Sequence, residues 1–120
     1  MNKLNLNSIM IGTNNVNTLA SFYEKVFERK ADMIEGDFSG WYVGNAMISF
    51  GSHSDVKGVS KEPSRIMFNF ETKEVSEEFE RIKATGAKVI TEPYRLGGAW
   101  IATFADPDGN YFQLMTPWES

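Results

Sequence analysis

Apolar residues recur with two different periods along the first half of the chain. Asn7–Thr13 alternates around isoleucines, which predicts a strand. Val16–Phe27 carries apolar residues three and four positions apart, and Asn15 or Asn17 offers an N-cap at its start, so we expect a capped helix. Three short runs follow at 31–35, 41–43 and 46–50, with glycines between them. The first half therefore predicts one strand, one helix and three further strands.

The same order of elements returns in the second half. The predicted elements are a strand at Arg65–Phe70, a helix from Val75 to Lys83 that Thr72 caps and Gly86 ends, a strand at Lys88–Glu92, a loop at 94–98, and strands at 100–105 and 111–115. The last two strands are joined by Asp106-Pro107-Asp108-Gly109-Asn110. Its proline and glycine favour a tight hairpin turn, so we interpret these five residues as structural.

A shift of 57 positions superimposes the two halves. It places Met10 on Met67 and Phe22 on Phe79, so that strand and helix core repeat in phase. We therefore predict an α+β fold of two βαβββ modules in tandem, within a single domain of 120 residues. The modules cover about 1–52 and 64–120, and the polar stretch 53–63 is the expected linker.

Composition and charge exclude several classes of function. The chain has no cysteine, which excludes disulfides and thiolate ligands. Its net charge of −4 argues against nucleic-acid binding, and no apolar run is long enough to span a membrane. We therefore expect a soluble cytoplasmic protein.

Alternation along the strands assigns their two faces. One face is uniformly aliphatic or phenylalanine and suits packing against helices. The other face mixes soft, aromatic and polar side chains, which is typical of a cavity lining. The residues expected on this second face are Ser8, Met10, Met47, Ser49, Arg65, Met67, Tyr111, Gln113 and Met115.

The repeat, the pair Phe22-Tyr23 and the closing turn at 106–110 together resemble the vicinal oxygen chelate superfamily. That superfamily includes glyoxalase I, bleomycin-resistance proteins, fosfomycin-resistance enzymes and extradiol dioxygenases. The resemblance implies a curled mixed sheet that forms a cup, with the helices outside. This sequence departs from the family pattern at Glu28-Arg29, where a glycine usually ends the first helix.

Metal-binding members of this superfamily carry ligands on the first and last strands of each module. By position, the resemblance places those sites at Ser8, Ser49, Arg65 and Gln113. Two serines and an arginine cannot form a histidine and carboxylate site, and His53, the single histidine, lies in the linker. We therefore predict neither a metal nor another cofactor, and we interpret His53 as a solvated loop residue.

The resemblance then favours the bleomycin-resistance-like members, which sequester a drug or a flat metabolite without turnover. Methionines and aromatics would bind such a ligand, with Phe38, Trp41, Tyr94 and Trp100 around the rim of the cup. Packing in the core or at a dimer interface is the alternative for the two tryptophans. Plain filling of the cavity is the alternative for Met10 and Met67.

Arg65 is the most informative single residue of this set. An arginine that points inward from a strand must find an anion. The partner would be Glu71, Glu92 or another carboxylate of the chain, or else a carboxylate, phosphate or phenolate of a ligand.

Two further interpretations stay open. One is a metal-independent lyase or isomerase that uses Tyr111, Tyr94, Glu35 or Glu92 as acid or base. The other is an interaction role in which the cup is a dimer surface. Because members of this superfamily commonly pair their modules across a two-fold axis, we expect a homodimer.

Overall fold

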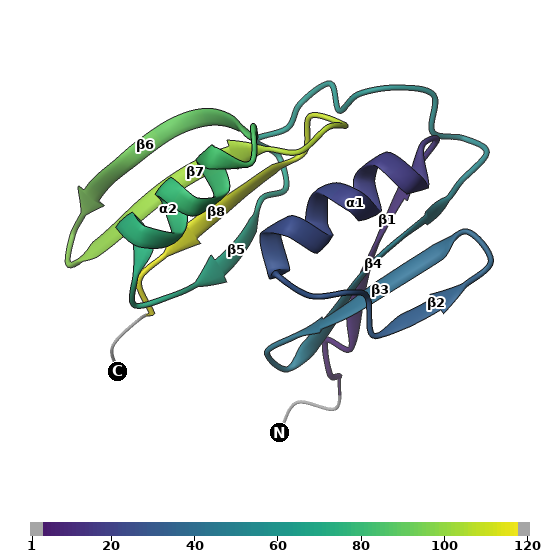
Figure 1. Ribbon diagram of the computed structural model, residues 1–120, viewed down its shortest axis with the longest axis horizontal. Helices are drawn as coiled ribbons and strands as arrows, with labels where there is room; N and C mark the ends of the chain where they lie inside the picture. The colour runs from purple at the N-terminus through teal and green to yellow at the C-terminus, as the bar shows by residue number, and fades with distance from the viewer. Residues whose placement is uncertain (1–3, 118–120) are drawn as a thin grey trace. The chain divides into compact units, whose positions relative to one another are not determined.

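The computed structural model describes residues 4–117, and within them the chain forms two βαβββ modules in tandem, as the sequence predicts. The elements are β1 (Ser8–Thr13), α1 (Val16–Phe27), β2 (Met33–Glu35), β3 (Phe38–Val43), β4 (Ala46–Ser52), β5 (Phe68–Glu71), α2 (Val75–Ala84), β6 (Lys88–Leu96), β7 (Ala99–Ala105) and β8 (Tyr111–Met115) (Figure 1).

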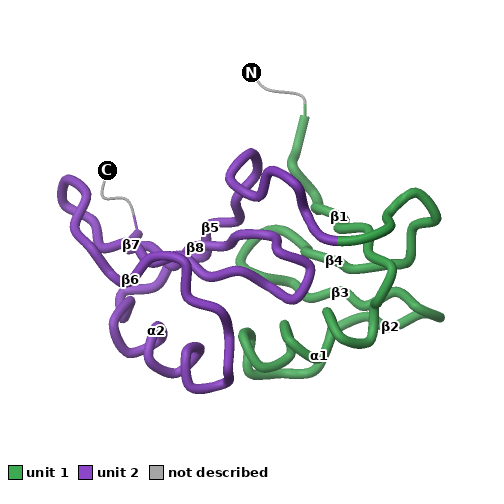
Figure 2. The backbone as a smooth tube through the Cα atoms, turned by 90° about the horizontal axis from the view of Figure 1, so that it is seen from above, with its two compact units in different colours: residues 1–58 green, residues 59–120 purple. Residues whose placement is uncertain are grey.

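The chain divides into two compact units, Met1–Gly58 and Val59–Ser120 (Figure 2). The division falls inside the predicted linker 53–63. The outer ends of the predicted modules, residues 1–3 and 118–120, lie outside the described residues. Each unit contains one α+β module.

Unit 1 has a four-stranded mixed sheet in the order β1-β4-β3-β2, and only the β1–β4 pair is parallel. Helix α1 covers one face of this sheet, and its inward positions are buried. Tyr23 stacks on Phe50 of β4 with ring centroids 4.5 Å apart. The core of unit 1 therefore lies between α1 and the face that carries Phe50.

Unit 2 repeats this arrangement with the order β5-β8-β7-β6. Helix α2 packs against β6, β7 and β8 (Figure 1). Phe79 of α2 packs on Phe104 with ring centroids 5.1 Å apart, and Phe104 stacks on Phe112 with ring centroids 5.5 Å apart. Neither four-stranded sheet closes on itself.

Local hydrogen bonds explain where the helices begin. The side chain of Asn15 accepts the N–H of Thr18 at 3.3 Å, which caps α1 as expected. Thr72 is not the cap of α2, because the residue in that position is Glu74, whose side chain makes no capping bond. The Thr72 hydroxyl instead accepts the N–H of Glu74 at 3.1 Å, so it orders the approach to the helix.

The turn between β7 and β8 is held by a buried carboxylate. Asp106 accepts the backbone N–H groups of Asp108 and Asn110, and also the side-chain amide of Asn110. Gly109 has φ of +82°, a conformation that favours glycine. Residues of this turn therefore keep the hairpin in register.

Among the strand boundaries that differ from the sequence prediction, those of β5 and β6 have a clear physical reason. β5 begins at Phe68 rather than Arg65, because the N–H of Arg65 bonds to the carbonyl of Glu62 and closes a turn there. β6 runs to Leu96 through Pro93, so residues 94–96 are not a loop. The proline is tolerated because β6 is an edge strand, and its pairing with β7 shifts register on the way.

Neither α1 nor α2 could cross a membrane, since no helix within residues 4–117 is long and apolar enough.

We predict that the backbone at residue 28 is strained. Glu28 follows α1 with φ of +58°, in the left-handed region that costs most residues about 1 kcal/mol or more. Glu28→Gly should therefore be more stable than Glu28→Ala by about 1 kcal/mol in urea unfolding. Both variants lack the glutamate side chain, so the difference between them reports the backbone alone.

Gly86 after α2 offers the matched control. It has φ of +94°, and a Cβ there would contact nothing within 4 Å. Gly86→Ala should lower the free energy of unfolding by about 1 kcal/mol for conformational reasons only. Equal stability of the Gly and Ala variants at position 28 would contradict the prediction of strain.

Candidate functional site

The face of the unit 1 sheet that α1 does not cover is the first candidate surface, and we call it the helix-free face of unit 1. The strand register places Ser8, Met47 and Tyr42 in one row across β1, β4 and β3. Met10, Ser49 and Gly40 form the next row. Register thus brings together four residues of this unit that the sequence analysis selected, namely Ser8, Met10, Met47 and Ser49.

Glycines make room for flexible side chains on this face. A Cβ added at Gly40 would lie 2.9 Å from the sulfur of Met47. A Cβ at Gly51 would lie 3.3 Å from the terminal methyl of Met10 and 3.6 Å from the ring of Phe38. The two thioethers and the Phe38 ring therefore lie over bare backbone, and 55% of Met10 is exposed.

Trp41 does not lie at the rim of this surface, which corrects its predicted position. Its register partner is Ile48, on the face that packs against α1. The residue is 1% exposed, and its ring centroid lies 5.6 Å from that of Phe27. It donates its indole N–H to the carbonyl of Arg29 at 2.9 Å. Core packing, the alternative interpretation, describes this tryptophan.

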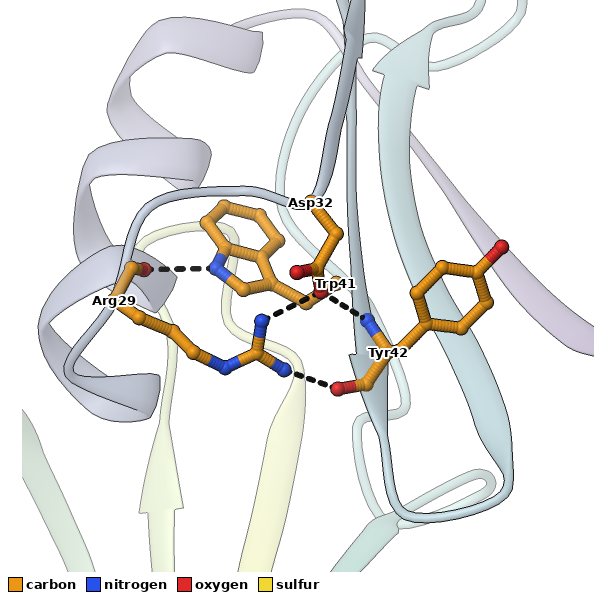
Figure 3. Close-up of polar contacts among 4 residues, drawn as sticks. All are labelled: Arg29, Asp32, Trp41 and Tyr42. Atoms are coloured by element: carbon orange, nitrogen blue, oxygen red, sulfur yellow. Dashed lines mark hydrogen bonds and ion pairs between the residues drawn. The ribbon is translucent and has the colours of Figure 1, made fainter.

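The neighbouring Tyr42 takes the opposite side of β3. Its ring points away from the helix side, and 57% of the residue is exposed (Figure 3). The sequence analysis missed it. Continuing the alternation of β4 across the hairpin would have found Tyr42, because it pairs with Met47.

A polar clasp fixes the two faces of β3 at this point. Asp32 binds the guanidinium of Arg29 and accepts the N–H of Tyr42 at 2.7 Å, while Arg29 also donates to the Tyr42 carbonyl (Figure 3). The hydrogen bonds from Arg29 and from the Tyr42 backbone lower the pKa of Asp32 below its ordinary value. The clasp joins the end of α1 to β3 and so orients Trp41 inward and Tyr42 outward.

The second candidate surface is the face of the unit 2 sheet that α2 does not cover, here called the helix-free face of unit 2. Register places Tyr111, Gln113 and Met115 of β8 on it. Gln113 donates its side-chain N–H to the Thr103 hydroxyl on β7 at 3.0 Å. Tyr94 of β6 also lies on this face, opposite Ile101.

Trp100 lies on the other side of β7, which again corrects a predicted rim position. It pairs with Arg95, whose guanidinium carbon lies 5.4 Å from the centre of the indole ring. Its neighbour Ile101 faces the helix-free side. Phe38 and Tyr94 are thus the two predicted rim aromatics that lie on helix-free faces.

Arg65 does not point inward from a strand. Its side chain is 70% exposed and pairs with Glu62 at 3.1 Å, ahead of the first residue of β5. Its carboxylate partner is therefore neither Glu71 nor Glu92. Met67 also precedes β5 and is exposed.

The residues present do not fit the metal site of the superfamily. The resemblance places the ligand positions at Ser8, Ser49, Arg65 and Gln113. Ser8 and Ser49 do not lie opposite each other on β1 and β4, because Ser49 pairs with Met10. Arg65 lies outside the sheet, and no three side chains of His, Cys, Asp or Glu gather as a metal site within residues 4–117. His53 accepts the N–H of Asp55 at 3.2 Å and packs against Gly12 in a loop. That the protein binds no metal in solution stays a prediction.

Comparison with known proteins assigns this architecture to a family. The family model described as a glyoxalase-like domain matches residues 8–115. A glyoxalase/bleomycin resistance protein/dioxygenase family enzyme from Burkholderia phytofirmans is similar, with 25% identity and a TM-score of 0.76 over 94% of this chain and 98% of that chain.

A glyoxalase-related enzyme from Fulvimarina pelagi has a TM-score of 0.78 over 94% of this chain and 88% of that one. Its 17% identity supports the fold alone. No curated protein matches the chain at a significant level.

We predict that the clasp loses its stabilising effect in acid. Because the pKa of Asp32 is lowered in the folded chain, the carboxylate stabilises the fold above the ordinary aspartate pKa of about 4. This contribution is lost as the pH falls through the lower folded value. Urea midpoints of the wild type and of Asp32→Asn should therefore differ at pH 7 and converge towards pH 3.

Asp37→Asn is the control, since it removes a carboxylate from the turn between β2 and β3 without touching the clasp. If the urea midpoint of the wild type exceeds that of Asp32→Asn by the same amount at pH 7 and at pH 3, the charge on Asp32 does not contribute to stability.

Proposed function

The chain belongs to the glyoxalase-like domain family, and from this premise we propose that it is a metal-free small-molecule binding protein that sequesters a drug or a flat metabolite without turnover. The glyoxalase/bleomycin resistance protein/dioxygenase family enzyme from Burkholderia phytofirmans is structurally similar along nearly the whole chain. The family named for that protein includes bleomycin resistance proteins, and this supports the choice of a drug as a candidate ligand.

The observation that carries the proposal is the composition of the helix-free face of unit 1. Met10, Met47 and Phe38 lie over the glycine positions of the sheet, and the exposed ring of Tyr42 stands beside them. Thioethers adapt to the outline of a ligand, and aromatic rings stack on flat ones. A planar, largely apolar compound matches these side chains better than a compact charged one.

Burial of apolar area would supply most of the affinity. At about 25 cal/mol per Å², covering roughly 300 Å² of apolar surface contributes about 7 kcal/mol. Loss of ligand and side-chain freedom removes several kcal/mol of that gain. We therefore expect dissociation constants in the micromolar range or weaker unless polar contacts add to them.

The methionines themselves provide the test. The chain has six, and ¹³C-methyl labelling gives one signal for each. Titration with bleomycin and with planar aromatic acids should shift the methyl signals of Met10 and Met47 saturably. Tryptophan fluorescence is the poorer reporter, because Trp41 is buried on the helix side.

Met47→Ala should weaken this binding severalfold, since it removes a thioether from the contact surface. Ile34→Ala is the matched control, because Ile34 is exposed on the same sheet but alternates to the other face. Absence of any saturable shift at Met10 and Met47 across the panel would overturn the proposal. Chemical change of the added compound in the same samples would favour the metal-independent lyase or isomerase.

We also propose that the protein is a cytoplasmic homodimer. Exposed apolar side chains on both units support self-association, among them Leu6 and Leu96. Light scattering after size exclusion should give twice the chain mass of 13.6 kDa. A monomer mass at high micromolar concentration would refute the dimer.

A further inference from the structure

Two methionines of unit 1 differ in how their sulfur atoms lie on the sheet. The sulfur of Met47 lies against the backbone, since a Cβ added at Gly40 would be 2.9 Å from it and within 3.5 Å of the two carbons bonded to it. A Cβ added at Gly51 would instead contact the terminal methyl of Met10 at 3.3 Å, with no sulfur of the described residues within 4 Å. Met10 therefore rests on the sheet by its methyl group, and its sulfur stands farther from the backbone.

Solvent exposure separates the two residues in the same direction. Met10 is 55% exposed, more than any other methionine within residues 4–117, whereas Met47 is only partly exposed. A peroxide oxidises a thioether by direct contact with a lone pair of the sulfur, so solvent access sets the order in which methionines react. The sulfur of Met10 is therefore the more reactive of the two.

The surroundings of Met10 suit a thioether and do not suit its oxide. A ring carbon of Phe38 lies 3.6 Å from the same added Cβ at Gly51, so the Met10 methyl and this ring share one stretch of bare backbone. Contact between a thioether and an aromatic ring is favourable. A sulfoxide is polar and chiral, and its oxygen loses hydrogen bonds to water when a flat ligand covers it.

We propose that Met10 is a site of reversible oxidation by hydroperoxides, and that its sulfoxide switches off ligand binding on the helix-free face of unit 1. The switch rests on the function proposed above, and the modification does not. In the forward step the Met10 sulfur attacks one oxygen of the peroxide. The O–O bond breaks, an S–O bond forms, sulfur loses two electrons, and the peroxide leaves as water or an alcohol. In the reverse step two thiols become a disulfide, and the oxygen leaves as water.

The ¹³C-methyl signals report the modification without any ligand. Stepwise addition of hydrogen peroxide should convert the Met10 methyl signal to that of a sulfoxide before the Met47 signal changes. Methionine sulfoxide reductases of both stereospecificities, with dithiothreitol, should then restore the Met10 signal. Oxidation of Met47 before or together with Met10, or a Met10 sulfoxide that the reductases do not reduce, would overturn the proposal.

Two leucine variants connect the modification to binding of 2-naphthoate, a planar aromatic acid. Oxidised wild-type protein should bind it at least about fivefold more weakly than untreated protein. Met10→Leu has no sulfur at this position, so its own affinity should be the same before and after treatment. Met33→Leu is the matched control, because Met33 is 40% exposed and pairs with Gly40 on the same sheet, and it should respond to peroxide as the wild type does. Resistance of Met33→Leu instead of Met10→Leu would overturn the role of Met10.

Met10→Gln gives the complementary result without an oxidant. Its amide places a polar group where the sulfoxide would lie, so it should bind 2-naphthoate at least about fivefold more weakly than Met10→Leu. Equal affinities of the two variants would contradict the switch. If no compound of the panel binds untreated wild-type protein, the proposed function fails and the switch fails with it. The order of oxidation still decides whether Met10 is the modified residue.

Discussion

Aromatic packing between each helix and its own sheet decides which strand face lies against the helix. In unit 1 the ring of Tyr23 stacks on Phe50, and in unit 2 Phe79 packs on Phe104. Because side chains alternate along a strand, fixing Phe50 and Phe104 inward fixes every other position of β4 and β7 outward. A slip of one residue would turn Ser49 or Thr103 towards a helix, so the packing also defines the two helix-free faces.

These faces have different chemical characters, although the modules share one topology. Unit 1 presents thioethers and aromatic rings over glycine backbone, which suits a flat apolar partner. Unit 2 presents an amide that Thr103 holds in place between apolar rows. The duplicated architecture thus carries two different sets of side chains on equivalent strand faces.

The sequence predicted the parts of the fold that have a long or repeated pattern. Helix α1 was found with Asn15 as one of two candidate caps, and the closing hairpin was found through its turn residues, because caps and turns are local. Trp41 was placed wrongly because a run of three residues does not reveal its partner, and pairing with Ile48 decides its face. Arg65 was misplaced because a backbone hydrogen bond sets the turn that begins at Glu62, and the pattern of apolar and polar residues does not reveal such a bond. The hydrogen bond from Gln113 to Thr103 depends on the register between β8 and β7, which the alternation within either strand alone does not give.

Pro93 in the middle of β6 has a consequence for how the protein behaves in concentrated solution. β6 is the longest strand and forms an edge of its sheet, so its outer backbone groups could template the addition of a strand from another molecule. Proline removes one donor from this strand, and the adjoining register shifts bend the edge. We therefore expect the same residue that complicates the sequence pattern to disfavour strand addition at the β6 edge of unit 2.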